Sequence, residues 1–100
     1  MTRKQLNDIA AQIERTVNSR HSSVPEMHIT TETRISNHIA WIDILPVRSE
    51  DRFSETIYFA EEILPFAAVY GFSVHFGIEH SDDGKPLPCI TFFYHDTQEG

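Results

Sequence analysis

Apolar residues recur at helical spacing near the start of the chain. Within residues 4 to about 20 they fall at steps of three and four, which predicts one buried stripe on a surface helix. The stripe consists of Leu6, Ile9, Ala10, Ile13 and Val17. Arg3 and Lys4 carry the wrong charge for the positive end of the helix dipole. We therefore expect the first turn of this helix to fray.

Alternating apolar and polar residues come next and are typical of half-buried strands. Residues 27–35 alternate and are rich in β-branched side chains, Ser36-Asn37 supplies a turn, and residues 39–47 follow as a second strand. The short connection favours an antiparallel hairpin. The second strand has apolar residues on both faces, with Asp43 among them, so we expect both of its faces to be partly covered.

A second helix is expected to begin at residues 49–51, where Ser-Glu-Asp can cap a helix and favour its dipole. Pro65 should kink this helix or start a new short one, and Gly71 is a plausible stop. One apolar stripe contains Phe53, Ile57, Ala60, Leu64 and Ala67. A second stripe contains Phe59, Ile63, Phe66 and Tyr70.

One sheet face cannot cover both stripes of the second helix. The second stripe could instead meet the same surface of a second copy, which predicts a twofold homodimer through Phe59, Ile63, Phe66 and Tyr70. The alternative is a helix buried between the sheet and the first helix.

The last third of the chain predicts a second hairpin. Residues 72–78 show the clearest alternation in the sequence, residues 89–95 are their partner, and the turn formers of residues 81–88 connect them. One face of this hairpin should carry Phe72, Val74, Phe76, Ile78, Ile90, Phe92 and Tyr94. The opposite face should carry His75, Glu79, Thr91, Phe93 and His95.

The element order is helix, strand, strand, helix, strand, strand. It predicts an α+β fold with two helices packed on a roughly four-stranded antiparallel sheet. The 100 residues and 40% apolar content suit one compact domain over residues 1–100, with the last few residues frayed. The αββ unit occurs twice without a residue-level repeat. Strand order stays open, because two hairpins can meet through several edges.

The sequence carries no recognisable export or membrane signal. The start, Met-Thr-Arg-Lys-Gln, lacks the apolar core of a signal peptide. Residues 63–78 form the longest run without an acid, Lys or Arg, but Pro65 and two glycines interrupt it, and a membrane helix needs about 20 apolar residues. Cys89 is the only cysteine, which excludes an internal disulfide and predicts a small buried strand residue. We expect a soluble cytoplasmic protein without membrane association.

Charge is distributed unevenly along the chain. After Arg52 there are eight acids and one base, Lys85, which gives this part a net charge of −7, whereas residues 1–52 sum to zero. Such a field repels nucleic-acid phosphate and favours a protein partner with a basic surface. We expect contacts from acids of the second helix and the following loop. These are Glu55, Glu61, Glu62, Asp82 and Asp83.

Residues that could carry chemistry form no strong motif. His75, His80 and His95 lie in the final hairpin, and neutral imidazoles are ligands for zinc, but their spacing matches no compact metal motif. Cys89 would need one of these histidines as a base, and nothing beside it would lower the pKa of its thiol. No cofactor is expected.

The sequence therefore predicts a small, acidic, non-enzymatic protein-interaction domain. Its sharpest form is an inhibitor or an immunity or anti-defence protein whose acids imitate nucleic-acid phosphate and block a basic surface of its partner. Direct nucleic-acid binding is not expected. Two alternatives stay open: a metal-binding protein or metal-dependent enzyme using His75, His80 and His95, and a homo-oligomeric structural or assembly subunit.

Overall fold

The chain folds into two helices and four strands, in the predicted order. The computed structural model describes residues 1–23, 28–47, 53–80, 82–84 and 86–95; for residues 53–59, 79, 86 and 87 only the backbone is described. The elements are α1 (Arg3–Arg20), β1 (Ile29–Ser36), β2 (Ile39–Pro46), α2 (Phe53–Tyr70), β3 (Ser73–His80) and β4 (Pro86–Tyr94). Met27, the predicted cap at residues 49–51 and the last five residues lie outside the described residues. The predicted α+β fold is confirmed.

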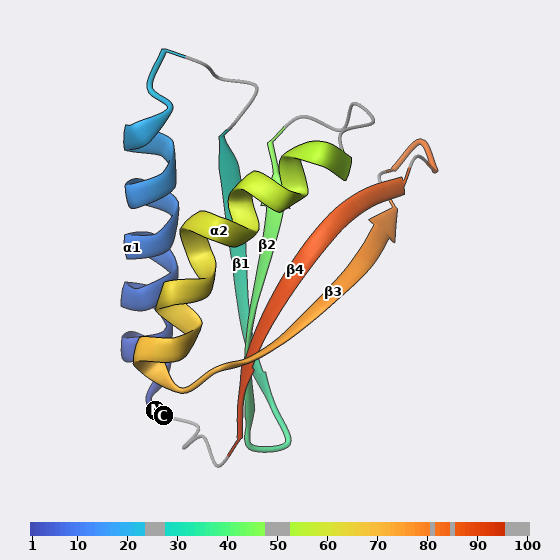
Figure 1. Cartoon of the computed structure of the whole chain (residues 1–100). Coiled ribbons are helices and arrows are strands. Elements are labelled where there is room, and N and C mark those ends of the chain that lie inside the picture. The colour runs from blue at the N-terminus through green and yellow to red at the C-terminus, as the bar shows by residue number, and fades with distance from the viewer. Residues whose placement is uncertain (24–27, 48–52, 81, 85, 96–100) are drawn as a thin grey trace.

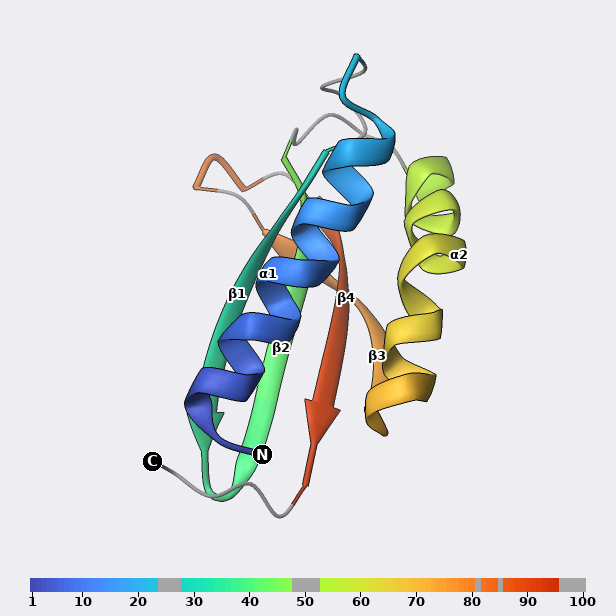
Figure 2. The same cartoon turned by 90° about the vertical axis from the view of Figure 1, so that its left-hand side faces the viewer.

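The sheet places one strand of each hairpin at its centre. Its order is β1-β2-β4-β3, and every neighbouring pair is antiparallel. Both helices lie on the same face of the sheet, with α1 alongside β1 and β2 and α2 beside β4 (Figures 1 and 2). Each αββ unit thus contributes one central strand, one edge strand and one helix of 18 residues. The strand order is therefore symmetric about the β2–β4 pair, whereas the helices differ, because α1 packs mainly on the edge strand β1 and α2 on the central strand β4.

The first helix begins with a capping box. The backbone N–H of Gln5 donates to the Thr2 hydroxyl at 3.2 Å, and the Thr2 N–H donates to the Gln5 side-chain oxygen at 2.8 Å. These reciprocal bonds satisfy two donors that a helix start leaves open. The capping box opposes the expected fraying of the first turn, which rests on the charges of Arg3 and Lys4 alone. The predicted stripe is confirmed, since all five of its residues are buried.

The first hairpin closes with a two-residue turn, Asn37-His38. Both residues have positive φ, 53° and 64°, as in a type I′ turn, whose twist matches that of the flanking strands. The turn lies one residue beyond the predicted one, and Ser36 pairs with Ile39. On β2 the side chains of Ala40, Ile42 and Ile44 are buried beneath the helices.

The second helix continues through Pro65, so that residue does not start a new helix. It ends at Tyr70, and the next residue, Gly71, has φ 77°. The Phe72 N–H donates to the Ala67 carbonyl at 2.9 Å. This 6→1 bond is the signature of a Schellman motif, which glycine favours because it has no Cβ. The prediction that Gly71 stops this helix is thus confirmed.

The buried face of α2 lies between the two predicted stripes. Ile63 is fully buried and Ala67 is 4% exposed, whereas Leu64 and Val69 are 38% and 77% exposed. Ile63 therefore belongs to the core of its own chain and is not available for the predicted dimer contact. Phe66 and Tyr70 are partly buried against the same core, and the Phe59 side chain lies outside the described residues. The reason is that α2 packs against both β4 and α1.

The residues of the final hairpin lie on the predicted faces, but two apolar residues of the core-facing side are exposed. Phe72, Ile90 and Phe92 are buried in the core, and Val74 packs against it. Phe76 and Ile78 lie on the same face but remain 55% and 54% exposed. Their exposure follows from position, because β3 is an edge strand and curves away from the helices (Figure 1).

Candidate interaction surface

The second face of the sheet is covered by neither helix (Figure 2). Alternation along the central strands directs Trp41 and Asp43 of β2 and Thr91 and Phe93 of β4, among others, to this face, and these four side chains are partly exposed. Arg34 of β1 and His95, just after β4, extend the same surface. We call these six residues the open sheet face.

An aromatic row crosses the open sheet face. Trp41 lies opposite Phe93 in the β2–β4 register, with ring centroids 5.6 Å apart. Arg34 lies opposite Trp41 on the other side, and its guanidinium carbon is 4.7 Å from the tryptophan ring centroid. His95 meets the Phe93 ring edge-on at 5.9 Å. Trp, Phe and Arg are enriched at the centres of protein interfaces, where their large side chains supply much of the contact area.

A polar row runs beside the aromatic one and holds it in place. The Thr91 hydroxyl donates to Asp43 Oδ1 at 2.8 Å, and Arg34 Nε lies 3.9 Å from Asp43 Oδ2. Asp43 thus has partners on both sides, which explains a carboxylate among apolar residues. Cys89, whose sulfur is 3.7 Å from the Thr91 hydroxyl oxygen, is 3% exposed and is the buried strand residue that the sequence predicts.

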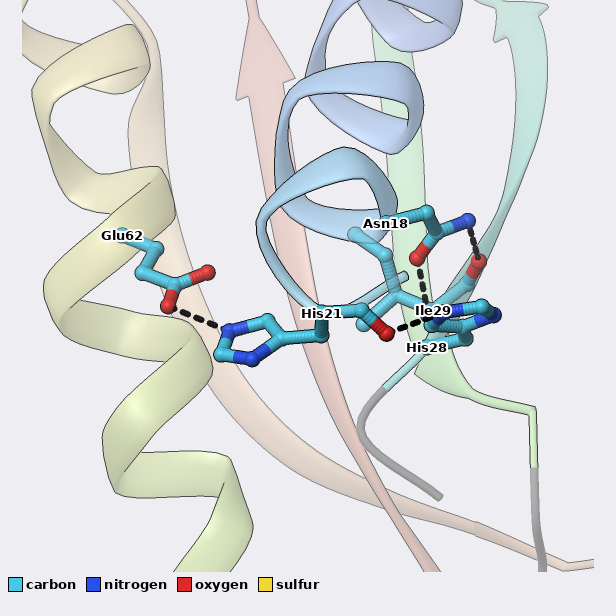
Figure 3. A network of polar contacts seen from close by, with 5 residues as sticks. All are labelled: Asn18, His21, His28, Ile29 and Glu62. Carbon is cyan, nitrogen blue, oxygen red and sulfur yellow. Dashed lines mark hydrogen bonds and ion pairs between the residues drawn. The ribbon is translucent and has the colours of Figure 1, made fainter. Parts of the chain in front are cut away.

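The structure separates the acids predicted to bind a partner. Glu61, Asp82 and Asp83 are exposed. Glu62 is not available, because its Oε1 lies 2.7 Å from His21 Nε2 and both side chains are only 19% exposed (Figure 3). The Glu55 side chain lies outside the described residues.

The His21–Glu62 contact belongs to a polar network at the end of α1 (Figure 3). The His28 Nε2–H donates to the His21 carbonyl at 2.7 Å. The Asn18 amide both donates to and accepts from the backbone of Ile29. These contacts join α1 to α2 and to β1, so we assign them a structural role. Their partners lie 7 to 41 residues apart, and no local motif in the sequence marks them.

Replacing Glu62 by alanine is expected to lower the free energy of unfolding by about 1 kcal/mol, because His21 loses its carboxylate partner in a half-buried position. The matched control is Glu61→Ala at the adjacent, exposed position, which should change it by less than about 0.5 kcal/mol. Urea unfolding followed by circular dichroism measures both. Equal losses would contradict the distinction between the two glutamates.

The histidines of the final hairpin do not come together. His75 lies opposite Thr91, and His80 lies opposite Pro86 at the end of β3. His95 follows β4, four positions beyond Thr91, which corresponds to about 13 Å along a strand. Among the described residues, no group of three His, Cys, Asp or Glu side chains is placed to hold a metal ion. The arrangement therefore gives the metal-binding alternative no assembled ligand set.

Two shallow hollows lie on the helix side, between α1 and the end of α2. The larger has a volume of about 400 Å³ and reaches Tyr94; the smaller has about 210 Å³ and includes Val69. A hydrogen bond of 3.1 Å from the Tyr70 hydroxyl to Gln12 Oε1 lies where they meet. Among the described residues that line the two hollows, Asp8 is the only Asp, Glu, His or Cys.

Neither described helix combines the length and the apolar character needed to cross a bilayer. Comparisons with protein-family models, with curated proteins and with solved structures find no match for this chain.

Proposed function

We propose that this protein is a non-enzymatic interaction domain that binds a protein partner with a basic surface through its open sheet face. The observation that carries the proposal is the partly exposed row of Arg34, Trp41 and Phe93 on the face of the sheet that neither helix covers. A partner that covered this row would bury two large rings and a stacked guanidinium.

The open sheet face is preorganised for binding. Its two aromatic anchors lie on the central strands and contact each other, while Asp43 and Thr91 fix the neighbouring positions. Side chains that are already ordered lose little entropy when a partner binds, so more of the contact energy appears as affinity. Trp41 and Phe93 are therefore the expected hot spots.

The net charge indicates the chemistry of the partner. The chain has a formal charge of −7, and Glu61, Asp82 and Asp83 are exposed outside the open sheet face. Exposed charges outside a contact surface mainly accelerate association with an oppositely charged partner, and salt screens their effect. A basic surface that binds nucleic acid would be attracted by this negative charge. An inhibitor that occupies such a surface, as an immunity or anti-defence protein would, is the specific form of the proposal.

Removing one anchor tests the contact surface. The protein is used to capture partners from its native host, the captured partner is purified, and its affinity for variants is measured by calorimetry. Phe93→Ala should raise the Kd roughly tenfold or more, as loss of an interface hot spot does. Val69→Ala is the control, since Val69 is exposed on α2, away from the open sheet face. A partner that binds Phe93→Ala as tightly as the wild type would overturn the proposal.

Neutralising the exposed acids tests the charge of the partner. A Glu61→Gln, Asp82→Asn, Asp83→Asn variant should associate several-fold more slowly at low salt and lose part of its salt dependence, while its dissociation rate stays nearly unchanged. Surface plasmon resonance at two salt concentrations measures this. Unchanged association kinetics would exclude a basic partner surface.

The inhibitor form of the proposal is tested separately, by measuring nucleic-acid binding of the partner with and without this protein. If the complex left the partner's nucleic-acid binding intact, the inhibitor form would be wrong.

A further inference from the structure

The strand β3 forms one outer edge of the sheet. β3 pairs with β4 on one side, and no described strand pairs with its other side. Phe76 and Ile78 on this strand are more than half exposed. Its sequence, Ser-Val-His-Phe-Gly-Ile-Glu-His, contains no Lys, Arg or Pro, which natural edge strands often use to prevent pairing, and Glu79 is its single acid.

The opposite edge of the sheet is protected. Glu32 and Arg34 of β1 are exposed and charged, and no residue of β1 is a large hydrophobic with more than half its surface exposed. In addition, the backbone N–H and carbonyl of Ile29 bind the side chain of Asn18, which takes the place of a neighbouring strand. The two edges therefore differ, although each αββ unit contributes one of them.

We propose that β3 pairs antiparallel with β3 of a second copy, about a twofold axis at Gly77. This register places Phe76 opposite Ile78 of the partner copy, twice, on the helix side of the sheet. It also places His75 opposite residue Glu79 of the other copy, twice, on the other side. Apolar pairs stabilise a sheet across neighbouring strands, and so do polar pairs that can hydrogen-bond, such as an imidazole and a carboxylate. The strand is thus complementary to itself, as a twofold interface requires.

Gly77 suits the position on the axis. A Cβ atom there would lie 3.3 Å from His75 Nε2, so the glycine leaves room for the imidazole ring beside it. A glycine within a strand often marks a point where another backbone approaches closely. The pairing would join the two sheets into one continuous sheet and would bury Phe76 and Ile78. It uses an edge distinct from the open sheet face, so it stands independently of the proposed partner.

The oligomeric state of the full chain tests this assembly. Sedimentation equilibrium of the wild type should give a dimer, and Ile78→Lys should weaken the dimer at least tenfold. Val69→Lys is the control, because Val69 is a more exposed apolar residue that lies on α2. A wild type that stays monomeric up to about 1 mM, or a dimer that Ile78→Lys leaves intact, would overturn the proposal.

A charge exchange tests the register. His75→Glu places two acids opposite each other and should weaken the dimer several-fold. The double variant His75→Glu, Glu79→His restores opposite partners in both pairs and should recover most of the lost affinity. A double variant that remains as weak as the single one would rule out the register centred on Gly77. Circular dichroism of each variant verifies that the fold is retained.

Discussion

Phe92→Ala is expected to lower the free energy of unfolding by about 3–5 kcal/mol. Phe92 is fully buried on the central strand β4, opposite Ile42 of β2 and Val74 of β3. Its ring stacks on Phe72, with centroids 5.7 Å apart. Truncation would therefore remove apolar contacts with both neighbouring strands and leave a cavity that a close-packed core cannot fully close. Urea unfolding at neutral pH measures the loss.

Phe93→Ala is the matched control, because the two phenylalanines are adjacent on the same strand. Phe93 points to the open sheet face and is only partly buried, so its truncation should cost ~1 kcal/mol. The variant should also fold well enough for the binding experiment proposed above. Equal losses for Phe92→Ala and Phe93→Ala would mean that the two faces of β4 are equally buried, and would contradict this architecture.

The elements and their faces could be predicted because each is encoded locally. The stripe around Ile13 has helical period and the alternation around Val74 has strand period, so each specifies an element without knowledge of the rest of the fold. Strand order could not be predicted, since either edge of either hairpin could have joined them. The orientation of α2 was equally ambiguous. Ile63 and Ala67 come from different predicted stripes, and only packing against β4 and α1 selects the face between them.

The candidate surface could not be predicted, because it depends on which strands pair and in which register. Trp41 and Phe93 become neighbours only through the β2–β4 register, which joins residues about half the chain apart. The sequence led us to expect that both faces of β2 are partly covered, and this is confirmed, because its side chains on the face without helices are only partly exposed. The structure adds that both helices lie on one face. Glu62 and His21 similarly meet across two helices. In contrast, the exposure of Asp82 and Asp83 followed from their turn-forming context.

The link between Asn18 and Ile29 predicts the second large effect on stability. The Asn18 amide donates to the Ile29 carbonyl at 3.0 Å, and the Ile29 N–H donates to Asn18 Oδ1 at 2.8 Å (Figure 3). The Val47 N–H donates to the His28 carbonyl, so the backbone groups of the next residue, Ile29, point away from β2. Without Asn18 these two groups would lack partners at a position where the side chain of Ile29 is 1% exposed.

Asn18→Ala is therefore expected to lower the free energy of unfolding by about 2–3 kcal/mol, because two partly buried backbone groups lose their hydrogen bonds. Asn7→Ala is the control on the same helix; the Asn7 side chain accepts an exposed hydrogen bond from Thr33, at 2.6 Å, and its loss should cost about 0.5 kcal/mol or less. Hydrogen exchange gives a local readout. The Ile29 amide should exchange faster in Asn18→Ala than the loss of global stability alone requires, whereas Asn7→Ala should leave it protected. Equal effects of the two asparagines would show that Asn18 does not replace a strand at this edge.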